Sequence, residues 1–119
     1  MSLLSAFSGR YLNHSFTTRS GARVRIVERP GRWMAPAALA PLVEDLRTVV
    51  RTTLPEESLD YGVLTGDPDR LGAAILTVVY SHDDGRPVAF NALSIMECEL
   101  RGKPAEVLHL GLVMVDPGY

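Results

Sequence analysis

The fold is decided by residues 73–115, AAILTVVYSHDDGRPVAFNALSIMECELRGKPAEVLHLGLVMV. This stretch contains three apolar runs, rich in β-branched residues, that are typical of strands: 73–81, 87–100 and 106–115. Asp83-Asp84-Gly85 and Arg101-Gly102-Lys103-Pro104 separate the runs, and both are turn sequences. Short turns connect antiparallel neighbours, so the stretch predicts a three-strand antiparallel meander.

A strand and two helices are predicted before the meander. Residues 22–28, ARVRIVE, alternate in polarity as a half-exposed strand does. Residues 36–52 predict a helix, because apolar side chains recur at steps of three and four: Leu39, Leu42, Val43, Leu46, Val49 and Val50. Proline and acidic residues at 54–61 predict a short second helix. We therefore expect an α+β domain over residues 22–119, with helices packed on a mixed sheet, after an N-terminal extension at 1–21.

Composition narrows the class of protein. A chain of 119 residues with 46% apolar letters suits one globular domain. No apolar run reaches the ~18 residues that a membrane span needs, so no membrane association is expected. Cys98 is the only cysteine, which excludes a disulfide scaffold and favours a reducing, cytoplasmic location. Lys103 is the only lysine among twelve Lys and Arg residues, which is typical of a GC-rich bacterial genome.

The uneven charge does not indicate a nucleic-acid partner. Residues 1–32 carry six arginines against the single acid Glu28. Arg23 and Arg25, however, alternate with apolar residues, as on the exposed face of a strand. A nucleic-acid site needs a basic patch with aromatic side chains, whereas this chain has a formal net charge of −2. No nucleic acid is expected among the partners.

The element order leads to a known family. The order strand, helix, helix and three strands, with Pro87-Val88-Ala89-Phe90 after a hairpin and HLGLVMVDPGY at 109–119, resembles the first half of a GNAT N-acetyltransferase. In that superfamily the fourth strand ends in a Val-x-Pro-x-Tyr-like segment. An Arg/Gln-x-x-Gly-x-Gly/Ala loop, which holds the acetyl-CoA pyrophosphate, normally follows at once. The resemblance covers residues 22–119 and implies that the chain ends just before this loop, as the N-terminal portion of a GNAT-like domain.

The resemblance also implies a reaction. A GNAT enzyme transfers acetyl from acetyl-CoA, its co-substrate, to a primary amine of a small molecule or peptide, without a metal. By this resemblance the main chain of Val113, Met114 and Val115 contacts the pantetheine arm, and its N–H groups polarise the thioester carbonyl. Ordinary strand core is the alternative explanation of the same three residues. Residues 1–119 contain no Gly-x-Gly-x-x-Gly or Walker-type run, so no phosphate-binding loop is expected within them.

His109 is the candidate catalytic base. It lies near the position at which several GNAT members place a basic glutamate on this strand. An unperturbed histidine pKa of ~6.5 suits proton transfer near neutrality. Strict alternation places His109 on one face with Gly111, Val113 and Val115. A hydrogen-bonded structural histidine is the alternative.

Tyr61 and Glu97 are the candidate substrate contacts. Tyr61 ends the predicted short helix at 54–61, in the region where GNAT acceptor pockets are often built. Glu97 is one of three acids around the 101–104 turn that would attract a cationic amine. For Glu97 the alternative is a solvated carboxylate beside a turn. For Tyr61 the alternative is an aromatic side chain that packs in the core, next to the acids of an ordinary helix start. The three histidines and Cys98 have no metal-like spacing, so no metal is expected.

A different class of function stays open. In a non-catalytic binding or assembly module, residues 106–115 would pair with another chain, a second copy included, because an exposed apolar strand edge recruits partners. A thioester hydrolase of the hot-dog type is a third alternative, although that fold usually has more strands after its helix.

Overall fold

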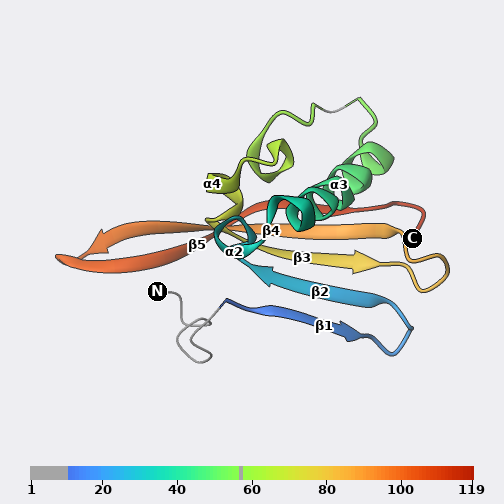
Figure 1. Ribbon diagram of the computed structural model, residues 1–119, viewed down its shortest axis with the longest axis horizontal. Coiled ribbons are helices and arrows are strands. Elements are labelled where there is room, and N and C mark those ends of the chain that lie inside the picture. The colour runs from blue at the N-terminus through green and yellow to red at the C-terminus, as the bar shows by residue number, and fades with distance from the viewer. Residues whose placement is uncertain (1–10, 57) are drawn as a thin grey trace.

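A computed structural model of the chain describes residues 11–56 and 58–119. Within these residues five strands form one sheet: β1 (Asn13–Thr17), β2 (Arg23–Glu28), β3 (Ala74–Tyr80), β4 (Pro87–Leu100) and β5 (Lys103–Val115). The strands follow one another in chain order, and every neighbouring pair is antiparallel (Figure 1). The α+β class and the meander are confirmed. The prediction of a mixed sheet was wrong, because each described strand runs antiparallel to the strand before it.

The helices cover one face of the sheet. They are α2 (Pro30–Trp33), α3 (Pro36–Thr53), the 3-10 helix η1 (Gly62–Thr65) and α4 (Pro68–Leu71). The predicted helix at 36–52 is confirmed as α3. The predicted helix at 54–61 was wrong, since the described residues there are not helical and residue 57 lies outside the described part. Helix nucleation is unfavourable, and in proteins the packing of an apolar stripe offsets its cost. Residues 54–61 contain no continuous apolar stripe.

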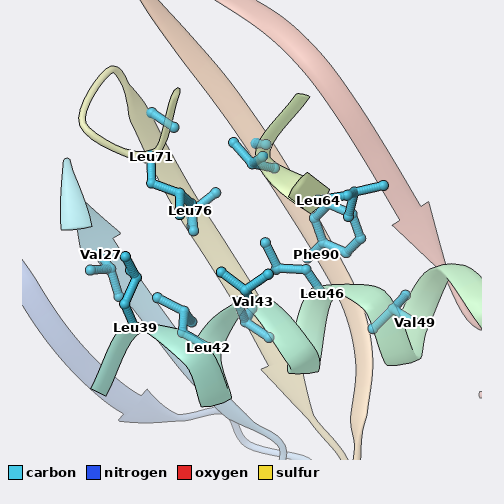
Figure 2. Packing of buried hydrophobic residues seen from close by; sticks show 14 of the residues in the cluster. Val27, Leu39, Leu42, Val43, Leu46, Val49, Leu64, Leu71, Leu76 and Phe90 are labelled. Atoms are coloured by element: carbon cyan, nitrogen blue, oxygen red, sulfur yellow. The ribbon is translucent and has the colours of Figure 1, made fainter. Parts of the chain in front are cut away.

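The core lies between α3 and the middle of the sheet (Figure 2). The six apolar α3 positions predicted to share one stripe are all buried. They pack against side chains of β2, β3 and β4, among which Val27, Leu76 and Val78 are fully buried and Phe90 is 2% exposed. Each such side chain contributes roughly 1.5–3 kcal/mol through burial. Helix α3 is therefore held by packing on the sheet.

Two features of the sheet were not predicted. Residues 13–17, within the expected N-terminal extension, form the edge strand β1. Strands β4 and β5 continue past the end of β3 as a two-stranded arm, residues 96–107, which projects beyond the rest of the sheet (Figure 1). At its tip Arg101 and Gly102 both have positive φ, 51° and 76°, the pattern of a two-residue hairpin turn.

None of the helices in the described part of the chain has the length and apolar character to span a membrane.

Candidate functional site

Gly111 interrupts the regular pairing of β4 and β5. Ala92 pairs with Leu112 and Leu93 with Leu110, so Gly111 is the extra residue of a β-bulge. A Cβ atom at Gly111 would lie 3.3 Å from the carbonyl oxygen of Ala92, an approach that favours glycine. The bulge changes which side chains of β5 share a face, because one residue is left out of the alternation.

This bulge moves His109 to the other face of the sheet. His109 pairs with Ser94, which lies on the same face as Phe90 and the helices, since both are even-numbered positions of the regular strand β4. The prediction that His109 shares a face with Val113 and Val115 was therefore wrong. The His109 side chain is exposed on the helix-covered side.

The outer edge of β5 presents unpaired backbone groups. Strand β5 is the last in the sheet order of the described residues. The N–H of Asp116 donates to the carbonyl of Val88 at 2.7 Å, so the backbone of Asp116 and, two residues earlier, of Met114 points toward β4. Because the direction alternates, the N–H groups of Val113 and Val115 point away from β4 to the open edge.

Side chains along this edge are apolar and exposed. Val113 and Val115 are 56% and 54% exposed, and Leu108 and Leu110 are 57% and 56% exposed. Residues 107–115, called the β5 edge below, contain no Asp, Glu, Lys or Arg. Soluble proteins normally protect an edge strand with charges, proline or a covering element. The β5 edge is therefore the strongest candidate for contact with a ligand or partner.

The three predicted backbone contacts do not behave alike. Val113 and Val115 direct their N–H groups to the open edge of the sheet. Met114 pairs with Phe90, and its side chain packs against the core. Two of the three residues therefore offer N–H donors on the β5 edge. Met114 instead pairs within the sheet and packs against the core.

Tyr61 and Glu97 lie in separate parts of the molecule. Tyr61 is half-buried and packs against the core cluster, on the helix-covered side. Glu97 is exposed in the arm, where it pairs with Glu106 on the opposite side of the sheet from His109. Only Tyr61 is therefore on the same side as His109.

A buried arginine was missed by the sequence patterns. Arg29 is 3% exposed and has a φ of 47°, which is rare for a residue with a side chain. Its Nη1 donates to the carbonyl of Gly72 at 3.3 Å, and its Nη2 lies 2.6 Å from Oε2 of Glu106. This ion pair ties β5 to the turn before α2. Because its carboxylate is paired with Arg29, Glu106 is not available to bind a cationic amine.

Asp116 fixes the end of β5 beside Val115. Its Oδ2 lies 2.6 Å from Nη1 of Arg86, and its Oδ1 accepts the N–H of Gly118 at 2.9 Å. The Arg86 hydrogen bond, followed by that of Gly118, holds the pKa of Asp116 below its ordinary value. These contacts keep the last residues of the β5 edge in place.

Replacing Asp116 by asparagine should reduce the acid sensitivity of the fold. A carboxylate whose pKa is depressed in the folded state stabilises the fold above the ordinary Asp pKa of about 3.9, and that contribution is lost as the pH falls through the lower folded value. The urea midpoint of wild type should therefore fall more steeply than that of Asp116→Asn below about pH 4. Asp60→Asn, at an exposed position, is the control. Equal slopes for wild type and Asp116→Asn would contradict this role.

The described residues include no group of three or more His, Cys, Asp or Glu side chains that is placed to hold a metal ion. A scan of the chain against models of protein families finds no match, and a search of curated proteins finds none either.

Proposed function

We propose that the chain belongs to a GNAT-type N-acetyltransferase in which the acetyl thioester of acetyl-CoA lies along the β5 edge. The observation that supports this most is the pair of outward N–H groups at Val113 and Val115, next to the bulge at Gly111. Donors held on a rigid strand stabilise the negative charge that develops on a thioester carbonyl oxygen. The amide groups of a pantetheine arm would pair with the open edge as an added strand does.

In the proposed reaction the amine nitrogen of the acceptor attacks the thioester carbonyl carbon. The C–N bond forms as the C–S bond breaks, and the CoA sulfur leaves and takes up a proton. The proton lost from the amine goes to a base, for which we propose His109. The acceptor would approach from the helix-covered side, where His109 and Tyr61 lie. Glu97 has no place in this arrangement, because it lies on the other side of the sheet.

The experiment uses the natural gene product that carries this chain. Incubation with acetyl-CoA and a panel of primary amines, followed by mass spectrometry, should detect acetylated amine and free CoA in equal amounts. A reducing cytoplasm is the proposed compartment, since Cys98 is exposed and has no second cysteine to pair with. Absence of transfer to every amine would contradict the proposed function.

Replacing His109 by alanine should lower kcat/KM for the amine by about 10²-fold, the usual contribution of a general base. The rates of wild type and variant are compared from about pH 6 to 9. His14→Ala is the matched control, since His14 is an exposed histidine of the opposite edge strand, β1. Wild-type rates for His109→Ala across this range would end the proposal that His109 is the base.

A second candidate function is favoured by the apolar character of the same edge. Four side chains that are each more than half exposed, without a charge among residues 107–115, suit pairing with the β5 edge of a second copy. Light scattering after size exclusion distinguishes this candidate. A dimer that dissociates in Leu110→Lys would support an assembly module, and a strict monomer would argue against it.

A further inference from the structure

An open cavity of about 480 Å³ lies on the side of α3 that faces α2, η1 and α4. One wall is a stripe of α3 at spacings of three and four residues: Pro36, Leu39, Ala40, Val43, Glu44 and Arg47. The other wall comes from segments near residues 31–34 and 65–68. The volume falls within the ~300–1,000 Å³ of typical small-molecule sites. This cavity is separate from the β5 edge.

Most of the cavity wall is apolar. Leu39 and Val43 of α3 belong to the core cluster (Figure 2). Both residues also line the cavity. Met34 and Pro68 close the opposite side, and Gly66 contributes no side chain there. An apolar chain would bury its surface on these groups without displacing a charged one.

Arg47 supplies the polar end. Its Nε donates to the carbonyl of Leu64 at 2.9 Å, which fixes the plane of the guanidinium group. In the part of the chain that the structure describes, neither Nη nitrogen of Arg47 has a hydrogen-bond partner. A guanidinium group that is held through Nε and presents both Nη groups is suited to bidentate binding of a carboxylate.

The negative charge of Glu44, the other charged residue that lines the cavity, is balanced by Arg51. Glu44 pairs with Nη1 of Arg51 at 2.5 Å, and this hydrogen bond lowers the pKa of Glu44. Glu44 and Arg51 together contribute no net charge, whereas Arg47 leaves one positive charge at the cavity. The charge balance therefore favours an anionic ligand over an amine.

We propose that this cavity binds a small carboxylic acid with an unbranched apolar chain. Its carboxylate accepts hydrogen bonds from both Nη groups of Arg47, and its chain lies between Leu39, Val43 and Met34. The proposal does not depend on acyl transfer at the β5 edge.

Isothermal titration calorimetry with octanoate tests the proposal, and octan-1-ol serves as the neutral probe of equal chain length. Wild type should bind octanoate saturably at one site and at least about tenfold more tightly than octan-1-ol. Arg47→Gln should weaken octanoate binding by about tenfold or more. Arg70→Gln removes an exposed arginine that does not line the cavity, and should leave the affinity within about twofold.

Ala40→Trp is the second variant, because Ala40 is exposed and lines the cavity, so an indole at this position fills the space while every charged and core residue is left unsubstituted. It should abolish octanoate binding while leaving the melting temperature close to that of wild type. The proposal is overturned if octanoate does not bind saturably, if octan-1-ol binds equally well, or if Ala40→Trp retains wild-type affinity.

Discussion

Alanine in place of Gly31 is expected to destabilise the fold by about 3 kcal/mol or more, as overpacking at a rigid contact does. Gly31 is the point at which α2 touches α4. An added Cβ would lie 2.0 Å from the carbonyl oxygen of Pro68, 2.5 Å from the nitrogen of Gly72 and 2.9 Å from the carbonyl carbon of Leu71. All three are backbone atoms, so no change of rotamer relieves the clash and the two helices must separate. Urea unfolding of wild type and Gly31→Ala measures the difference.

Gly118→Ala is the control for that substitution. Gly118 has no positive φ, and an added Cβ would meet only Oδ1 of Asp116 at an ordinary 3.4 Å. Its free energy of unfolding should stay within about 0.5 kcal/mol of wild type, as at other surface positions. If Gly31→Ala were as stable as Gly118→Ala, the close contact between α2 and α4 would be incorrect.

Replacing Val113 by proline is expected to lower the rate of acyl transfer by about 10²- to 10³-fold, the usual effect of removing one oxyanion donor. Proline lacks the N–H group, and that of Val113 points away from β4, so no hydrogen bond within the sheet is lost. Proline is tolerated at an edge strand when its nitrogen faces solvent. The melting temperature should therefore change little while kcat falls. Steady-state kinetics of the natural gene product, beside a thermal melt, give both quantities.

Two further proline variants make this result specific. Leu108→Pro changes another position of the β5 edge, before the bulge, and should leave kcat within about threefold of wild type, because it removes no proposed oxyanion donor. Met114→Pro removes an N–H that points toward β4, and it should lower stability. If Val113→Pro and Leu108→Pro reduced kcat equally, the loss would reflect general disturbance of the edge and not the loss of a donor.

The regular elements followed from local sequence patterns. Helix α3 was predicted because the spacing of Leu39, Leu42 and Leu46 already encodes the face that packs on the sheet. Strand β4 was predicted with its bounds, since the turn sequences at 83–85 and 101–104 delimit the run at 87–100. Strand β1 was missed, because its five residues, NHSFT, are all exposed and carry no apolar periodicity.

The errors at the candidate site have a common physical origin in contacts between distant residues. Gly111 is a bulge only because of where Ala92 and Leu93 meet β5, and a strand read alone gives no sign of it. One unseen bulge was enough to place His109 on the wrong face. Arg29 and Glu106 are separated by 77 positions, so neither indicates the other in the sequence.

The most direct test of the β5 edge as the acyl thioester site is an NMR titration of the ¹⁵N-labelled natural gene product with S-acetylpantetheine. If the thioester lies along the β5 edge, the largest amide shift changes occur at Val113 and Val115, while the amides of β1, on the opposite edge of the sheet, stay unchanged. Shift changes at Val113 and Val115 no larger than those along β1 would contradict it.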